Sequence, residues 1–216
     1  MRQVIILLIF SGIVAACNNS GKKKTVLEDS TAQADTIILP QQVDDTRRDS
    51  TLLALTQEIL GYLKSKKYDS LALFVDPAAG IRFSPYAFID TAHDQIISAA
   101  MLNKWADKKK QDKINWGNKD ATGDPIISTM DEYVNQFVYD IDFLKADSIK
   151  VNQFIGGGNS QNNLLAVYTG ANFVESYFKG VDKKLEGMDW RSLRLVFTFR
   201  EGKYYLAGVV HDEWSI

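Results

Sequence analysis

The strongest structural signal in the sequence is an alternation of apolar and polar residues near its C-terminus. Within residues 191–199 the apolar side chains at alternate positions are Leu193, Leu195, Phe197 and Phe199. This spacing is typical of a strand with one buried face. Residues 200–203 have the composition of a turn, and residues 204–210 are again β-prone. We therefore predict an antiparallel hairpin at this end of the chain.

The other end of the folded region shows helical spacing instead. Leu52, Leu55, Ile59 and Leu63 recur at three- and four-residue steps. Ser50 or Thr51 can cap the start of this helix, and the lysines of residues 64–67 suit its end. A second short helix fits residues 69–75, because Pro77 follows it closely. Together the two segments predict a helical hairpin.

Shorter elements are expected in between. Residues 80–84, 114–117, 125–127, 148–155 and 171–178 are β-prone. Ser98 can cap a helix that runs to about residue 108, and residues 128–132 hold two overlapping capping-box patterns. Helices first and long strands last predict an α+β fold, with an N-terminal helical hairpin packed on a curved antiparallel sheet. This order is similar to the cone-shaped NTF2-like fold, in which such a sheet encloses a pocket.

The chain begins with the three parts of a secretion signal. Arg2 gives positive charge, residues 4–14 are almost wholly apolar, and small residues follow. The apolar run is shorter than the ~20 residues that span a bilayer. Its ending, Val14-Ala15-Ala16-Cys17, resembles the lipobox of bacterial lipoproteins. That resemblance implies cleavage after residue 16 and acylation of Cys17, including palmitate. The alternatives are an ordinary signal peptide with an incidental cysteine, or an uncleaved anchor.

Cys17 is the only cysteine, so disulfides and thiol chemistry are excluded once it is acylated. Residues 17–49 are mostly polar and predict a lipidated cysteine with a flexible tether. Residues 50–216 predict a single α+β domain. Apolar residues make up 45% of the chain and aromatics 11%, as expected for a globular core.

Charge excludes one class of partner. Removing residues 1–16 takes away Arg2, which leaves 24 basic against 27 acidic residues and a net charge of −3. A chain without basic excess is not expected to bind nucleic acid. The membrane is expected as a partner only through the N-terminal lipid.

Three stretches carry a closer resemblance: residues 80–86, residues 187–197 (GMDWRSLRLVF) and residues 208–214 (GVVHDEW). They resemble an uncharacterised family of secreted lipoproteins that is common in Bacteroidetes. The resemblance covers roughly residues 52–216. The family has no assigned activity, so it implies a fold and a location but no chemistry.

Six side chains are candidates for a ligand pocket: Arg82, Tyr86, Trp190, Arg191, His211 and Trp214. His211 precedes Asp212, and a histidine near a carboxylate can act as a general base. Adjacent strand residues point to opposite faces, so the alternative is a structural pair that ties down the chain end. Arg82 and Tyr86 flank Pro85, whose interruption of a strand is typical of a bulge near a site or of a protected edge.

Arg191 could clamp a carboxylate or a phosphate, and Trp190 could supply a stacking wall. The alternative is an ion pair between Arg191 and Asp189 or Asp90, with the tryptophan in the core.

No pattern supports a metal, a cofactor or a catalytic residue. His93 and His211 are the only histidines, and residues 90–94 read as a solvated acidic loop. The glycine run at 156–158 lacks the Lys-Ser/Thr pair of a phosphate loop and predicts a turn. Gly-x-Ser-x-Gly does not occur in the sequence.

These patterns favour a non-enzymatic module that binds a small molecule, a glycan or an envelope protein. The alternatives are a pocket enzyme of NTF2-like type that uses a carboxylate or His211 as base, and a structural role in envelope assembly. Asn18 gives no Asp-type inner-membrane retention signal, so we expect the outer membrane. Residues 22–24 are lysines where surface-exported lipoproteins carry acidic residues, which favours the periplasmic side.

Overall fold

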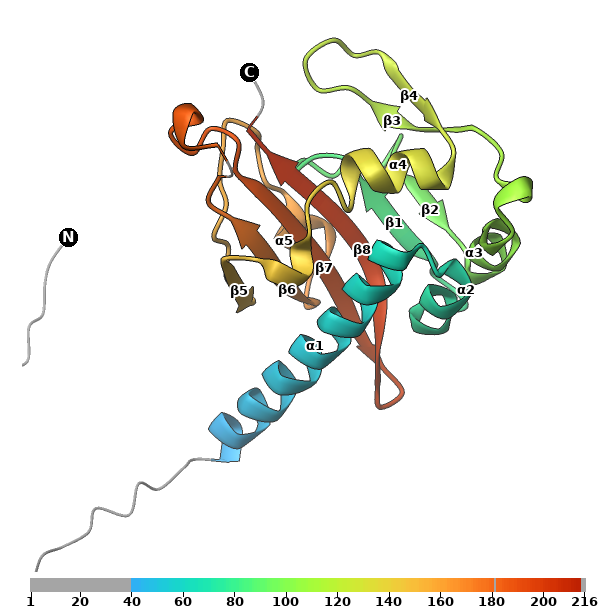
Figure 1. Ribbon diagram of the computed structural model, residues 1–216. Coiled ribbons are helices and arrows are strands. Elements are labelled where there is room, and N and C mark those ends of the chain that lie inside the picture. The colour runs from blue at the N-terminus through green and yellow to red at the C-terminus, as the bar shows by residue number, and fades with distance from the viewer. Residues whose placement is uncertain (1–39, 181, 215–216) are drawn as a thin grey trace, which may run out of the picture. The chain divides into compact units, whose positions relative to one another are not determined.

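Helices pack on one six-stranded sheet and one two-stranded ribbon (Figure 1). The computed structural model describes residues 40–180 and 182–214, with side chains from residue 44 onward. The helices are α1 (Pro40–Ser65), α2 (Tyr68–Leu71), α3 (Ala99–Ala106), α4 (Met130–Phe137) and α5 (Leu164–Val167), with 3-10 turns η1 (Ala72–Phe74), η2 (Lys108–Lys110), η3 (Phe143–Lys145) and η4 (Lys183–Leu185). The strands are β1 (Ile81–Ser84), β2 (Gln95–Ile97), β3 (Ile114–Asn118), β4 (Pro125–Ser128), β5 (Ser148–Val151), β6 (Asn172–Phe178), β7 (Arg191–Arg200) and β8 (Lys203–Glu213). The predicted α+β class is confirmed.

The large sheet has the strand order β2-β1-β8-β7-β6-β5. All neighbours are antiparallel except β1 and β8, which run parallel. The predicted C-terminal hairpin is its longest pairing, and Glu201 and Gly202 turn the chain with φ angles of 53° and 78°. Two positive φ angles in a two-residue loop match the twist of the flanking strands. The predicted hairpin is therefore confirmed.

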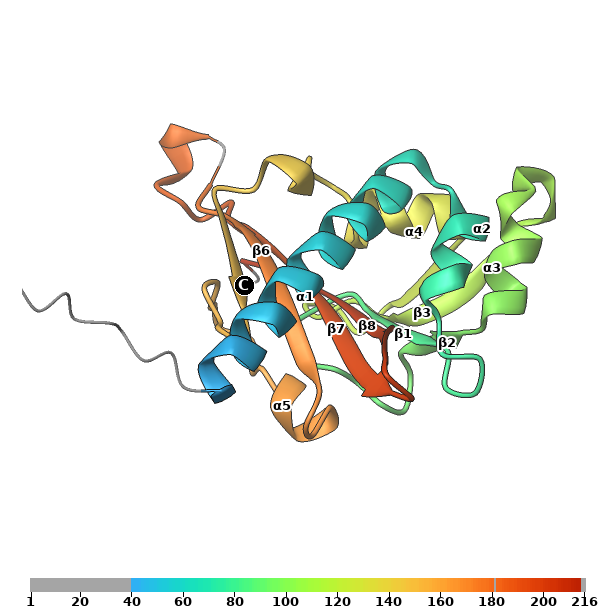
Figure 2. The same cartoon turned by 90° about the horizontal axis from the view of Figure 1, so that it is seen from below.

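Helix α1 lies across one face of this sheet (Figure 2). Its fully buried residues are Leu52, Thr56, Ile59, Leu60 and Leu63, and Leu55 is partly buried, so the spacing that predicted the helix also marks its packed face. The α2 and η1 turns follow directly, where the second short helix was predicted. Among residues 40–180 and 182–214, none of the helices combines the length and the apolar character needed to cross a membrane.

The start of α1 corrects the predicted boundary between tether and domain. The helix begins at Pro40 and not at Ser50, so residues 40–49 belong to the folded unit and not to a flexible tether. Proline suits the first helical turn, and Arg48 pairs with Asp45 at 2.7 Å one turn earlier. The hydroxyl of Ser50 donates to the carbonyl of Arg47 instead of capping the helix. Residues 17–39 lie outside the described part of the chain.

Two apolar clusters occupy opposite faces of the sheet. Leu193, Leu195 and Phe197 pack with α1 in the larger cluster, as their alternation predicts. Val196 and Val210 point the other way and pack under the segment that contains α5. This second buried face explains why the hairpin strands are apolar on both sides.

Most predicted short elements are confirmed, with differences at their ends. Thr129 and Glu132 form a complete capping box at α4, and the Ser98 hydroxyl accepts a hydrogen bond from Met101 at α3. The strand expected at 148–155 ends at Val151, because the backbone at Asn152 has a positive φ of 54°.

Candidate functional site

Arg191 and His211, two of the predicted pocket residues, meet at a third residue, Asp140. The Nε atom of Arg191 lies 2.7 Å from Asp140 Oδ2, and Nε2 of His211 lies 3.3 Å from Asp140 Oδ1. Arg191 also pairs with Glu213 at 3.1 Å. Burial opposes ionisation of Asp140, but hydrogen bonds from His211 and Arg191 lower its pKa. The ion-pair partners are thus Asp140 and Glu213, and neither of the expected ones, Asp189 and Asp90.

His211 is completely buried, so its ring cannot reach a substrate. Asp212, its neighbour, points to the other face of the sheet and pairs with Arg194 at 2.8 Å. The two residues therefore do not form a dyad, as expected for adjacent positions on a strand.

Of the remaining predicted residues, only Trp190 contacts this cluster, through its carbonyl, which accepts a 3.0 Å hydrogen bond from Arg191 Nη1. Trp190 is only 5% exposed, and its ring covers the backbone of Gly156 and Gly158. A Cβ at Gly156 would stand 2.8 Å from that ring. Close packing against Trp190 thus accounts for glycine at this position, and a bound nucleotide is not needed to explain it. Trp214 is 40% exposed, while Tyr86 packs edge-on against Phe137. The structure therefore does not bring the six residues into one pocket.

A buried polar cluster that the sequence did not reveal lies under the glycine run. Arg194 and Glu175 have no exposed surface, and their side chains are 3.1 Å apart between Nη2 and Oε1. Glu175 also accepts hydrogen bonds from the backbone of Gly156 and from the Ser192 hydroxyl. Burial raises the pKa of Asp212, although Arg194 acts in the opposite direction. This cluster fixes the loop to the sheet and is closed to solvent.

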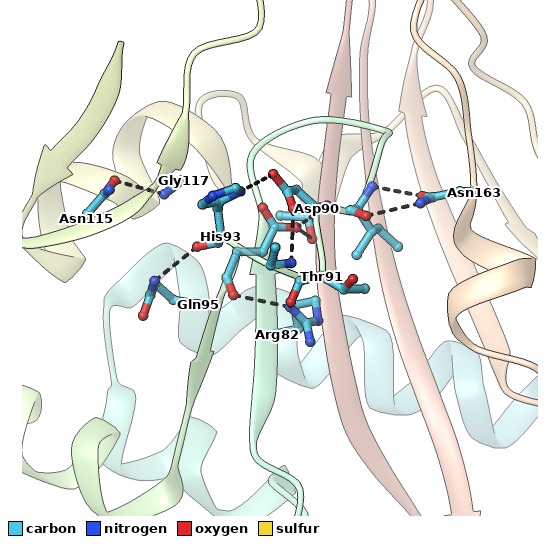
Figure 3. Close-up of polar contacts among 12 residues, drawn as sticks. Arg82, Asp90, Thr91, His93, Gln95, Asn115, Gly117 and Asn163 are labelled. Carbon is cyan, nitrogen blue, oxygen red and sulfur yellow. Dashed lines mark hydrogen bonds and ion pairs between the residues drawn. The ribbon is translucent and has the colours of Figure 1, made fainter. Parts of the chain in front are cut away.

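The loop between β1 and β2 forms the third polar arrangement (Figure 3). Asp90 and His93 point toward each other, with His93 Nδ1 2.6 Å from Asp90 Oδ2. The hydrogen bond to His93 lowers the pKa of Asp90. Asp94 is 8% exposed and accepts hydrogen bonds from the Ser84 hydroxyl at 2.5 Å and the Asp90 amide at 3.0 Å. Burial raises the pKa of Asp94 to about 6. The expectation of a solvated acidic loop thus fails for Asp94, whereas residues 91–93 are exposed and Asp90 is half-buried.

The predicted Arg82 serves this loop and not a ligand. Its Nη1 atom donates to the carbonyls of Asp94 at 3.2 Å and Thr91 at 3.4 Å. Asn163 holds the preceding residue, Ile89, through hydrogen bonds of 2.8 Å and 3.0 Å to its amide and carbonyl. Figure 3 shows these contacts on either side of Asp90. The loop is thus held by side chains from outside it.

A small cavity of about 180 Å³ adjoins this loop, and we call it the Asp94 cavity. It is lined by Pro85, Tyr86, Phe88, Asp90, Asp94, Asn118, Lys119 and Asp120. Tyr86 is thus the one predicted pocket residue that lines it.

A larger groove of about 710 Å³ lies between the N-terminal half of α1 and the tip of the β7–β8 hairpin. We call it the α1–hairpin groove. It is lined by Asp44, Asp45, Arg47, Arg48, Thr51, Leu55, Phe74, Phe199, Gly202, Lys203 and Tyr204. None of the six predicted pocket residues is among them. The groove depends on the ten extra residues of α1, which the sequence pattern assigned to the tether.

In comparisons with known proteins, no family model, curated protein or solved structure matches the chain. Within the part of the chain that the structure describes, His, Asp and Glu side chains do not gather in a group of three that could hold a metal ion. A third hollow of about 310 Å³ is lined by Asp140, Ile141, Asp189 and Arg191, so Arg191 is a predicted pocket residue that lines a hollow. Of these three hollows, the α1–hairpin groove has the greatest volume.

Proposed function

We propose that this chain is a lipid-anchored envelope protein whose domain binds a small amphipathic acid in the α1–hairpin groove, without catalysis. The single observation that carries the proposal is the groove itself. Its volume of about 710 Å³ falls within the ~300–1,000 Å³ of pockets that enclose small molecules.

The walls of the groove favour an apolar body in the ligand. Leu55, Phe74, Phe199 and Tyr204 contribute apolar surface, and Phe199 is 60% exposed. The rings of Phe199 and Tyr204 lie 4.7 Å apart and form a continuous wall. An aromatic of this exposure gains free energy when a ligand covers it.

The rim favours an acidic head group. Three basic and two acidic side chains line the groove, so the lining carries a net charge of +1. Arg48 is already paired with Asp45 and Asp49. Lys203 makes a long hydrogen bond of 3.4 Å to a carbonyl and its Nζ lies 5.0 Å from the centre of the Tyr205 ring. Neither Lys203 nor Arg47 forms an ion pair with any residue of the described segments. These two cations are available for a carboxylate or a phosphate.

Calorimetric titration with dodecanoate tests the proposal, with dodecanol as a neutral comparison. We expect saturable binding of dodecanoate, and about tenfold weaker binding to a Phe199→Ser variant, because part of an aromatic wall is lost. Leu165→Ser is the matched control, since Leu165 is 58% exposed but lies on α5, away from the groove. Equal affinity of both variants, or no binding to the native protein, would contradict the proposal.

The cations are tested separately. Arg47→Gln combined with Lys203→Gln should weaken dodecanoate binding but leave dodecanol binding unchanged, because only the acid needs a positive partner. If both ligands lose affinity to the same extent, the rim does not recognise the acid.

The anchor is a proposal of its own, because Cys17 lies outside the described residues. Its support is the lipobox-like ending of the signal, and the location that we propose is the periplasmic side of the outer membrane. We expect Cys17→Ala to abolish incorporation of labelled palmitate and to release the protein from the membrane fraction. A variant that stays in the membrane would indicate an uncleaved anchor instead.

We also propose that the fold is NTF2-like and that the chain belongs to the secreted lipoprotein family described above. The position of α1 across a mostly antiparallel sheet supports the first part. An experimental structure with α1 detached from the sheet would contradict it. The enzymatic alternative with His211 as base has no such support, because that side chain is fully buried.

A further inference from the structure

We propose that the Asp94 cavity binds a small organic cation, such as a primary ammonium, with the Asp94 carboxylate as its partner and Tyr86 and Phe88 as its aromatic wall. This site is separate from the α1–hairpin groove and does not depend on the function proposed for that groove. The site combines an acidic and aromatic lining, a buried acid and a loop that is held by side chains from outside it.

The lining selects for positive charge. Asp90, Asp94 and Asp120 line the cavity against a single basic side chain, Lys119, which gives a net charge of −2. Tyr86 and Phe88 face the same cavity, and aromatic rings attract organic cations through their negative faces.

The Asp94 carboxylate has one oxygen free for a ligand. Oδ2 accepts both hydrogen bonds of the side chain, from Ser84 and from the Asp90 amide. Oδ1 accepts no hydrogen bond from the residues that the structure describes, and it is not one of the fully buried polar atoms without a partner, so this oxygen keeps some accessible surface although Asp94 as a whole is only 8% exposed. An accessible carboxylate oxygen of this kind can accept a charge-assisted hydrogen bond from a cation in the cavity.

Glycine at position 117 keeps this oxygen uncovered. The φ angle of Gly117 is +125°, and a Cβ there would stand 3.4 Å from Asp94 Oδ1. A side chain at this position would extend over the carboxylate from strand β3. The strand therefore passes beside Asp94 without occupying the space next to it.

No basic side chain of the described chain already neutralises Asp94. The nearest candidate, Arg82, is engaged with the backbone carbonyls of Thr91 and Asp94 and forms no ion pair with the Asp94 carboxylate. His93 is paired with Asp90. The position of the carboxylate is thus fixed by neighbours that form no ion pair with it, although the nearby charge of Arg82 acts to lower its pKa, and such preorganisation lowers the entropy cost of binding.

A metal ion fits the cavity less well than an organic cation. Hard metal ions need several oxygen ligands at once, and Asp90 already uses both of its oxygens for His93 and the Ala92 amide. The aromatic rings supply no oxygen ligand to a metal ion, whereas their negative faces stabilise an alkylammonium.

Titration of the full-length protein with propylammonium at pH 7.5 tests the proposal, followed by calorimetry and by amide chemical shifts. We expect saturable binding at millimolar concentration, with shifts at Gly117 and Asp94 but not in the α1–hairpin groove. Asp94→Asn should weaken binding about tenfold or more, because it removes a charge-assisted hydrogen bond. Asp112→Asn is the control, since Asp112 is exposed and pairs only with Lys104.

Three results would overturn the proposal. One is equal affinity of propylammonium for native protein and for Asp94→Asn. Another is binding of propanol or propionate as strong as that of propylammonium. The third is the absence of shifts at Gly117 when propylammonium is added. A Phe88→Ala variant, whose side chain is half exposed and outside the core, keeps the test valid if Asp94→Asn fails to fold, and it should bind propylammonium several-fold more weakly.

Discussion

Replacement of Asp94 by asparagine should change the pH dependence of stability in a defined direction. Burial raises the pKa of this carboxyl from 3.8 to about 6. Between these values the folded state holds a proton that the unfolded chain releases, so stability falls as pH rises. The contribution of Asp94 is therefore fully present below pH 4 and is lost as pH rises through about 6. A shift of this size corresponds to at most about 3 kcal/mol, at 1.36 kcal/mol per pKa unit.

Asparagine keeps an oxygen that can accept the hydrogen bonds from Ser84 and from the Asp90 amide, but it does not titrate. The free energy of unfolding of Asp94→Asn, minus that of the native protein, should therefore rise by up to about 3 kcal/mol from pH 4 to pH 7. Urea denaturation at several pH values measures it, and other titrating groups largely cancel in the difference. A difference that stays constant, or that falls with pH, would refute the reasoning.

Three further substitutions test the packing and the caps, each by urea denaturation. Arg194→Met should cost about 3–5 kcal/mol, because two buried carboxylates lose their cation, and a cost below about 1 kcal/mol would contradict a charged cluster. Thr129→Ala should cost about 1 kcal/mol by removing the α4 cap, and no change would show that the cap is dispensable. Gly156→Ala should lower the free energy of unfolding by about 1–3 kcal/mol, because the new Cβ would collide with the Trp190 ring. Gly157→Ala is the control, because a Cβ there meets no atom within 4 Å, and equal losses of stability in the two variants would be inconsistent with the Trp190 contact.

The elements of this fold were largely predictable because local patterns report burial. Alternation at 193–197 and helical spacing from Leu52 to Leu63 each mark a side that faces the core, whereas Phe199 continues the alternation but is exposed at the hairpin tip. The start of α1 was not predictable in this way, because residues 44–51 are polar and largely exposed on all sides. A helix without an apolar face leaves no periodic signal in the sequence.

The candidate sites were less predictable, because they depend on contacts between distant segments. Asp140 lies more than 50 residues before Arg191, so the pairing that occupies Arg191 and His211 has no local signature. The buried partnership of Glu175 with Arg194 follows only from the β6–β7 register. In the sequence, Asp94 is one of several acidic residues in a polar loop. Its burial depends on Ser84 of β1 and on Gly117 of β3, which are distant in the sequence but lie beside it.

The most direct test of the central claim locates the ligand on the protein. A dodecanoate analogue with a photoreactive diazirine on its chain would be bound, irradiated and mapped by mass spectrometry of peptides. We expect labelling in the peptides that contain Phe74, Phe199 and Tyr204, and competition by excess dodecanoate. Labelling at other exposed apolar residues, such as Leu165 or Met188, without labelling in the groove would contradict it.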